Sequence, residues 1–243
     1  MIPLPPSGRT FSGHARVRLG DVSPKGRLRL DAAARYAQDV ANDDAVDAIG
    51  EDAAGWVVRR TTLHVERFPV FREDMRLTTW ASGTGGRWAE RRTSIAGERG
   101  GAIEVEALWV HVDLDTGRPK RLAPSFFEVY GEAAGGRTVT ARLGHGGPPA
   151  DSDHDAITRS PWPLRFTDFD LLGHVNNAVY WAIVEECFDL EAPTTVVVEY
   201  RGGIDRGQQT AVVVAGRELW ILADGQVAAT GRCETGGLYS ASP

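Results

Sequence analysis

The chain has 243 residues, 42% hydrophobic and 25% charged, a balance that is typical of a globular protein and excludes a disordered or fibrous one. A net charge of −6 excludes a general nucleic-acid-binding protein, which needs a basic face to neutralise phosphates. The length suits two small domains of about 120 residues each.

Neither a membrane segment nor a metal centre is indicated. No apolar run reaches the roughly 20 residues of a membrane span, and the opening MIPLPPSGRT lacks a signal peptide's basic and apolar regions. We therefore expect a soluble cytoplasmic protein. The two cysteines, Cys187 and Cys233, lie far apart and outside any metal-ligand spacing, so we expect reduced thiols, no metal site and no cofactor.

The first half of the chain predicts a helix followed by an antiparallel sheet. Residues 14–20 alternate like a short strand, and a turn at 23–26 leads into the helix. Its apolar face consists of Leu30, Ala33, Ala34, Ala37, Val40 and Ala41. Strands are predicted at 56–68, 75–82, 87–96 and 102–114. This order is typical of the α+β class, with the helix packed on one face of the sheet.

The second half repeats this pattern after a linker. Residues 131–158 are rich in Gly, Ala, Pro and Asp, without any sustained period. Beyond them we expect a strand at 161–167, a turn through Gly173 and a helix at 174–187. Four more strands are predicted at 194–201, 210–216, 218–222 and 226–234.

The repeat indicates an internal duplication. Sliding VRLGDVSPKG (17–26) onto LRFTDFDLLG (164–173), an offset of 147 residues, superposes an Arg, an Asp and a Gly. At two positions the halves differ: Ser23 corresponds to Asp170, and Arg27 to His174. If the halves share a fold, only the second keeps this ionisable pair.

The densest polar cluster lies between the strand and the helix of the second half. It consists of Asp168, Asp170, His174, Asn176 and Asn177. One interpretation is a capped turn, in which Gly173 permits the tight backbone and an Asn satisfies N–H groups of the first helical turn.

The other interpretation is a catalytic site. A helix N-terminus presents free N–H groups that polarise a carbonyl oxygen and stabilise an oxyanion, here those of Gly173 to Val175. Asp170 would attack a thioester carbonyl or deprotonate a water, while His174 and Asn177 orient the reacting groups. The chain contains no G-x-S-x-G, H-E-x-x-H, Walker A or helix-opening G-x-G-x-x-G motif, so rival hydrolase and nucleotide-binding chemistries have no support.

Three segments resemble the acyl-ACP thioesterase family. RFTDFDLLGHVNNAVYWAIVEE (165–186) is similar to the hotdog thioesterase signature D-x-D-x-x-G-H-V-N-N-x-x-Y, in the manner of 4-hydroxybenzoyl-CoA thioesterase. GWVVRRTTLHVERFPVFREDMRLTTWASGTGGRWAERR (55–92) and ALWVHVDLDTGRPKRLAP (107–124) resemble the N-terminal hotdog of plant and bacterial acyl-ACP thioesterases.

The resemblance implies a tandem double hotdog of the α+β class, each half a long helix wrapped by an antiparallel β-sheet. An N-terminal hotdog at 1–130 would hold the acyl chain, a linker would span 131–158, and a C-terminal hotdog at 159–243 would be catalytic. The family's catalytic Asp and His fall on Asp170 and His174, and its helix acid on Glu186 or Glu185. No cofactor is implied, and fatty acid biosynthesis is the expected setting.

Two family residues are replaced. The catalytic Asn two residues after the Asp is Leu172, and the later Glu-Cys pair is Gly203-Ile204 in an ungapped alignment. The site thus resembles the simpler acyl-CoA thioesterases, which leaves acyl-ACP and acyl-CoA both open as the substrate and partner. A non-catalytic acyl-thioester-binding protein and, less favoured, an enoyl-thioester hydratase remain alternatives, as do a monomer and a homodimer.

Substrate-binding residues are expected in the first half. Ala34 and Ala37 would line the acyl pocket, and Trp56 and Trp80, with Trp88 and Trp109, either line it or belong to the core. Arg118, Lys120 and Arg121 follow the last strand of this half and form a candidate docking patch for acidic ACP.

Overall fold

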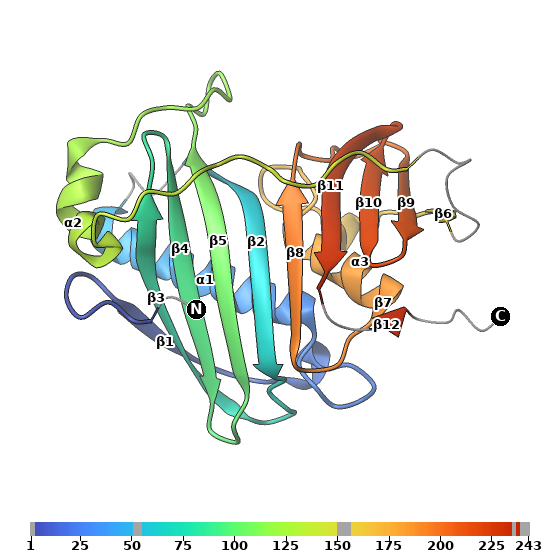
Figure 1. The fold of residues 1–243 in the computed structure, drawn as a ribbon, viewed down its shortest axis with the longest axis horizontal. Coiled ribbons are helices and arrows are strands. Elements are labelled where there is room, and N and C mark those ends of the chain that lie inside the picture. Colours follow the sequence, from blue (N-terminus) through green and yellow to red (C-terminus); the bar gives the residue numbers. More distant parts are fainter. Residues whose placement is uncertain (1–2, 51–54, 150–156, 235–236, 239–243) are drawn as a thin grey trace.

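A computed structural model describes residues 3–50, 55–149, 157–234 and 237–238. The strands of both halves form one antiparallel sheet, in the order β1-β3-β4-β5-β2-β8-β11-β10-β9-β6 (Figure 1). The first half contributes β1 (Phe11–Arg16), β2 (Trp56–Arg67), β3 (Asp74–Thr84), β4 (Trp88–Gly97) and β5 (Ala102–His111). The second contributes β6 (Ile157–Pro161), β8 (Thr194–Tyr200), β9 (Thr210–Ala215), β10 (Glu218–Ala223) and β11 (Gln226–Cys233). A separate pair consists of β7 (Phe188–Asp189) and β12 (Gly237–Leu238).

The two halves join where β2 pairs with β8. The register runs from Arg60 opposite Glu199 to Val65 opposite Thr194. Backbone hydrogen bonds therefore continue across the boundary, and one sheet serves both halves.

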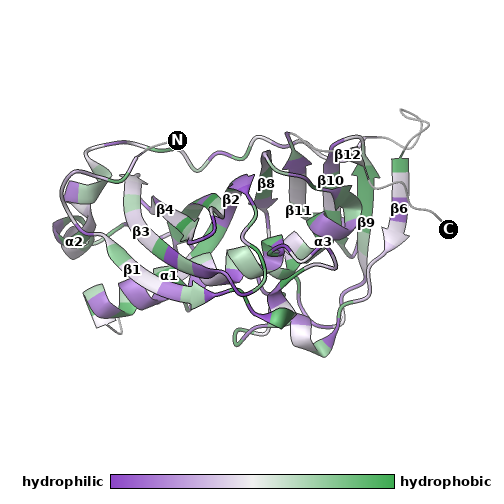
Figure 2. Cartoon of the chain, turned by 90° about the horizontal axis from the view of Figure 1, so that it is seen from below, coloured by the Kyte–Doolittle hydropathy of each residue, from purple (hydrophilic) through white to green (hydrophobic). Residues whose placement is uncertain are grey.

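Helices α1 (Leu30–Ile49) and α3 (Val179–Cys187) lie in contact on the same side of this sheet (Figures 1 and 2). Leu30 and Ala33 on α1, and Ile183 and Val184 on α3, belong to one buried apolar core with the inward side chains of the strands. The burial of this shared core packs both helices against the sheet. The sequence predicted a long helix in each half, but α3 has only nine residues, because His174 and Val175 form isolated β-bridges and residues 177–178 form a turn.

A third helix, α2 (Pro124–Ala134), is one that the sequence pattern did not predict. It begins with Pro at its first helical position and ends at Gly135, which has the left-handed conformation that suits glycine. Phe126 and Tyr130 pack it against Ala81 of β3 and Ala89 of β4. The expected linker therefore begins with the last turn of this helix.

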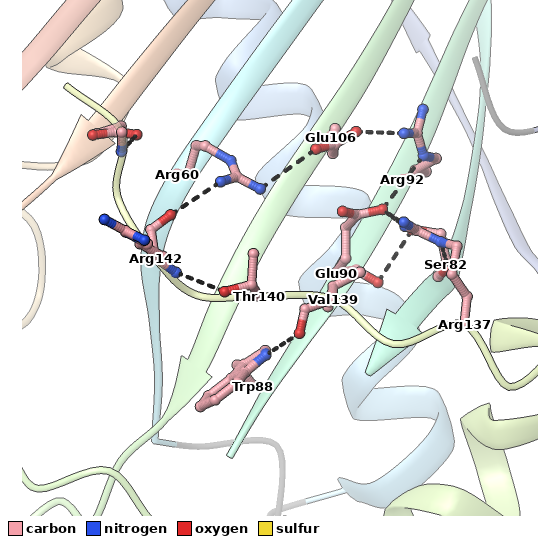
Figure 3. A network of polar contacts seen from close by, with 12 residues as sticks. Arg60, Ser82, Trp88, Glu90, Arg92, Glu106, Arg137, Val139, Thr140 and Arg142 are labelled. Atoms are coloured by element: carbon pink, nitrogen blue, oxygen red, sulfur yellow. Dashed lines mark hydrogen bonds and ion pairs between the residues drawn. The ribbon is translucent and has the colours of Figure 1, made fainter. Parts of the chain in front are cut away.

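Residues 135–149, the crossing segment, run over the sheet face opposite α1 (Figure 1). Arg137 donates to the Ser82 carbonyl at 2.6 Å and contacts the buried Glu90 carboxylate (Figure 3). Further along, the Gly144 and His145 N–H groups both donate to the Glu199 carboxylate on β8, at 2.7 and 3.0 Å. The part of the predicted linker that the structure describes is thus hydrogen-bonded to both halves of the sheet.

The internal duplication is visible in matching hydrogen bonds. Short 3₁₀ helices at Leu19–Asp21 and Phe166–Asp168 precede the two turns. The Arg18 N–H donates to Asp21 at 3.1 Å, and the Arg165 N–H donates to Asp168 at 2.7 Å. Each aspartate therefore holds the start of its turn in the same way.

The turns themselves also match. The Ser23 N–H donates to the Arg27 carbonyl at 2.8 Å, and the Asp170 N–H donates to the His174 carbonyl at 2.9 Å. Gly173 closes the second turn with φ at 81°, and its counterpart Gly26 closes the first turn with φ at 75°. The sequence offset of 147 residues is therefore a structural equivalence in this region.

Most predicted strands agree with the structure within a few residues, apart from the one expected at 161–167. There the structure has β6 ending at Pro161 and a 3₁₀ helix at Phe166–Asp168. Within the described residues, no helix is long and apolar enough to cross a membrane, and no group of three or more His, Cys, Asp or Glu side chains is arranged to hold a metal ion.

Candidate active site

The turn that carries Asp170 is held by its own backbone, which leaves the carboxylate half-buried. Its Oδ1 accepts the Leu172 N–H at 2.9 Å. No described side chain forms an ion pair with it, and its second oxygen has no partner among the described residues. Asp170 also lies close enough to Tyr180 for its charge to act together with burial, the larger cause, in raising the pKa of that phenol. The Asp170 carboxylate thus keeps one oxygen without a partner in the described part of the chain.

Asp168 has a different environment, although it is only two residues away. Its side chain is 3% exposed and accepts both the Arg165 N–H and the Arg165 guanidinium, the latter at 2.8 Å. This carboxylate is committed to the turn.

Two of the N–H groups that the sequence predicts as oxyanion donors are hydrogen-bonded within the protein. The Gly173 N–H donates to the Asp170 carbonyl at 3.0 Å, and the Val175 N–H donates to the Ile204 carbonyl at 2.9 Å. Both of these N–H groups already have acceptors inside the protein, so neither is free to bind an oxyanion in this structure. The N–H of Asn177, two residues before α3 begins, has no acceptor among the described residues.

The Asn177 backbone is held by the Tyr200 hydroxyl, which is itself held by Trp181. Tyr200 donates its hydroxyl to the Asn177 carbonyl at 3.3 Å and accepts the Trp181 indole N–H at 3.1 Å. Burial, the largest cause, raises the pKa of Tyr200, so this hydroxyl stays protonated and keeps donating. The side-chain oxygen of Asn176 accepts the Ala178 N–H at 2.9 Å and holds the turn that precedes α3.

His174 pairs with Asp205, a residue that the sequence analysis missed. The His174 Nδ1 lies 2.7 Å from an Asp205 oxygen, and the two side chains are 50% and 66% exposed. A Cβ added at Gly203 would lie 3.1 Å from the same Nδ1, so the position where the family pattern has its Glu does lie beside this ring. Asp205 is an acid two residues further on, which an alignment with a two-residue gap would have found.

A small pocket of about 30 Å³ lies between α1, the sheet and the segment that leads into α3. Its lining comprises Ala34, Ala37, Gln38 and Ala41 of α1, Val58, Thr61, Arg91, Thr93, Val105, Ala107 and Trp109 of the sheet, and Asn177, Ala178, Trp181 and Tyr200 of the second half. The guanidinium of Arg91 is paired with the buried Asp44 at 2.5 Å, so its charge is compensated. Ala34 and Ala37, which we expect to contact the acyl chain, line this space.

Several predicted residues lie away from this cavity. Asp170 and His174 are outside its lining and lie on the turn that leads to Asn177. Trp56 packs against His111 and Phe126, with ring centroids 5.0 and 5.5 Å away, and belongs to the cluster under α2.

The remaining predicted residues lie further from the turn. Trp80 is 2% exposed and buried in the sheet, outside the cavity lining. Glu186 is exposed on α3, whereas Glu185 contacts Arg27 and the start of α1. Arg118, Lys120 and Arg121 are exposed after β5 and form no ion pair within the described residues.

Comparison with known proteins agrees with this architecture. The chain matches the acyl-ACP thioesterase N-terminal domain over residues 8–130 and the acyl-ACP thioesterase C-terminal domain over residues 151–231. An uncharacterized protein of Mycobacterium tuberculosis is 32% identical over 217 residues, 87% of this chain and 85% of that protein. A chloroplastic acyl-[acyl-carrier-protein] hydrolase of Cuphea viscosissima is 26% identical over 163 residues, 60% of this chain and 37% of that protein.

Solved structures share the fold at low sequence identity. A putative oleoyl thioesterase from Lactobacillus plantarum superposes with a TM-score of 0.76 at 20% identity, over 95% of this chain and 97% of that one. The 12:0-ACP thioesterase from Umbellularia californica gives 0.72 at 21% identity, over 93% and 96%. Two hotdog folds fused in tandem define a double-hotdog protein. Its pocket lies beside the segment that leads into α3. The chain belongs to the acyl-ACP thioesterase family.

Proposed function

We propose that the protein hydrolyses fatty acyl thioesters, with acyl-ACP as the carrier form, to free fatty acid and carrier thiol. The observation that carries the proposal is the cavity between α1 and the sheet, because its lining includes Asn177, whose N–H has no protein acceptor among the described residues. Release of the acid from acyl-ACP would end chain elongation in cytoplasmic fatty acid biosynthesis.

In this proposal the acyl chain lies along the alanine face of α1. The thioester carbonyl oxygen accepts the Asn177 N–H, where the free N–H and the dipole of α3 favour negative charge. The thiol side of the substrate extends past the exposed His174 towards solvent, where a carrier protein has room.

Asp170 acts as the general base. It takes a proton from a water molecule, whose oxygen forms a bond to the carbonyl carbon and places negative charge on the carbonyl oxygen. Collapse of this intermediate breaks the carbon–sulfur bond, and the leaving thiolate takes up the proton that Asp170 holds. His174, oriented by Asp205, would position the water or the thioester.

A non-catalytic acyl-thioester-binding protein is the second candidate. The observation in its favour is that Asp170 and His174 lie outside the cavity lining. Such a protein would bind acyl thioesters at Asn177 without cleaving them.

The deciding experiment measures thiol release from acyl-ACP and acyl-CoA of several chain lengths, with binding measured in parallel. Release by the parent that is lost in Asp170→Asn supports the hydrolase and excludes a contaminating enzyme. Measurable binding with no release from any substrate would support the binding protein.

A further inference from the structure

The N-terminal half contains a filled counterpart of the proposed site. One oxygen of the Glu185 carboxylate accepts the Leu30 N–H at the start of α1, at 2.6 Å. The other oxygen pairs with Arg27, also at 2.6 Å, and the Glu185 side chain is 12% exposed. A carboxylate from α3 thus occupies the N-terminus of α1.

The duplication assigns a counterpart to each partner in this contact. The offset of 147 residues that superposes the two turns carries Arg27 onto His174 and Leu30 onto Asn177. In the observed contact, α3 supplies the carboxylate and the start of α1 supplies the N–H. In the equivalent contact, α1 supplies the side chain and the segment before α3 supplies the N–H. The residue of α1 that corresponds to Glu185 is therefore Gln38.

The cavity gives independent support, because Gln38 and Asn177 both line it. Among the described residues, neither the Gln38 side-chain amide nor the Asn177 N–H has a hydrogen-bond partner. The position that corresponds to Glu185 therefore carries an amide in place of a carboxylate, and the N–H that corresponds to that of Leu30 is free among the described residues.

We propose that Gln38 is a substrate-contacting residue of this site and that its side-chain NH₂ donates to the acyl carbonyl oxygen together with the Asn177 N–H. The proposal rests on the proposed function for its substrate. The chemical reason for an amide is that a neutral donor adds a second hydrogen bond to the developing oxyanion. A carboxylate at this position would instead accept the Asn177 N–H, as Glu185 accepts that of Leu30, and would occupy the substrate's place.

The test uses Gln38→Glu, Gln38→Met and the control Asn42→Glu. Gln38→Glu recreates the Glu185 contact, whereas Gln38→Met keeps the side-chain length and helix propensity but removes the amide. Asn42→Glu adds the same charge at an exposed position on the same helix. Decanoate serves as the probe, because its carboxylate matches the group that Glu185 places on Leu30.

Amide resonances of isotope-labelled protein report the contact directly. In Gln38→Glu we expect the Asn177 amide proton to move downfield without ligand, because it gains a charge-assisted hydrogen bond, and decanoate affinity to fall more than about tenfold. In Gln38→Met we expect kcat to fall on the order of 10²-fold, with KM changed less than about threefold. Asn42→Glu should match the parent in every measurement.

An Asn177 resonance that stays in place in Gln38→Glu overturns the proposal, and so does a parent-like kcat in Gln38→Met. If Gln38→Glu does not fold, Gln38→Met decides through kcat and decanoate affinity, both of which must fall. If the parent hydrolyses no thioester while Gln38→Glu moves the Asn177 resonance and weakens decanoate binding, the contact stands and only the proposed hydrolysis fails.

Discussion

Asp170 and His174 are joined through their backbones, by a 2.9 Å hydrogen bond from the Asp170 N–H to the His174 carbonyl, while their side chains have separate partners. The imidazole pairs with Asp205, and the Asp170 carboxylate accepts only the Leu172 N–H within the described residues. The two side chains are therefore held by different partners, although their backbones are hydrogen-bonded to each other.

Asp170→Asn should lower kcat by roughly 10²–10⁴-fold, the range for loss of a positioned acid–base group. The melting temperature should change little, because an asparagine oxygen can still accept the Leu172 N–H. Steady-state thiol release and thermal unfolding measure the two effects.

Asp168→Asn is the matched control. It removes the charge from the buried bonds to Arg165, whose guanidinium is 75% exposed, so we expect a loss of about 1 kcal/mol in the free energy of unfolding and a rate close to the parent's. If Asp168→Asn lost activity while Asp170→Asn kept it, the base would be the other aspartate.

Asp205→Asn should reduce kcat less than Asp170→Asn does, because Asp205 acts only through His174. His174→Ala should lower kcat by more than Asp205→Asn and by less than Asp170→Asn, because His174 positions the reacting groups and Asp205 acts only through it. The two changes should be non-additive, so that the double variant is about as slow as His174→Ala alone. A double variant as slow as the product of both single effects would show that Asp205 acts elsewhere.

Ala37→Phe should shift the preferred substrate towards shorter acyl chains, because the phenyl ring occupies cavity volume next to α1. Overpacking should cost about 1–3 kcal/mol of stability. The rates over a series of acyl lengths measure the shift, and Val46→Phe, on the exposed side of α1, is the control. An unchanged profile in a folded Ala37→Phe would place the acyl chain elsewhere.

Charge reversal of Arg118, Lys120 and Arg121 to Glu should raise KM for acyl-ACP at low salt, if these side chains dock the acidic carrier. Hydrolysis of acyl-pantetheine, which has no protein carrier, should not change.

The control for this surface reverses Arg72, Arg76 and Arg99, which are exposed at the opposite ends of the strands. An equal rise in KM for both triple variants would mean a general charge effect, with no docking patch at residues 118–121.

Asp21 should make the stability depend on acid pH. Burial, the largest single cause, would raise its pKa, but hydrogen bonds from Tyr36, Arg18 and Arg35 outweigh it, so the pKa is lowered. A lowered folded-state pKa gives stability that is present above the unfolded value of 3.8 and is lost as the pH falls through the folded value. Asp21→Asn should therefore be less stable than the parent at pH 7, and the deficit should be smaller at pH 3, as measured by urea unfolding. An equal deficit at both pH values would contradict the lowered pKa.

The sequence predicted the sheet strands well, because their period-two burial leaves a clear pattern in the residues. It did not predict α2, because the segment PSFFEVYGEAA contains adjacent aromatic residues and a glycine, although its buried residues Phe126, Tyr130, Ala133 and Ala134 do follow helical spacing. Nor could it predict the crossing segment, whose position depends on contacts with Glu90 and Glu199 far away in the chain.

The site was predicted in part. A local motif identified Asp170 and the turn, since these residues are adjacent in sequence. Asp205 and Gln38 were missed because their role depends on the packing of separate elements. The start of α3 was placed too early, because hydrogen bonds to residues 168 and 204 hold the backbone before Asn177 in turns.

The residues of the second half that correspond to the alanine face of α1 have larger side chains. Under the offset of 147 residues, Ala34, Ala37 and Ala41 correspond to Trp181 and Val184 of α3 and to Phe188 of β7, three buried side chains. The small residues leave room beside α1, and the larger residues fill the equivalent space beside α3. Two identical subunits would have to carry both pockets or neither, whereas a fused chain can open one and close the other. The expected stoichiometry is therefore one acyl group for each polypeptide.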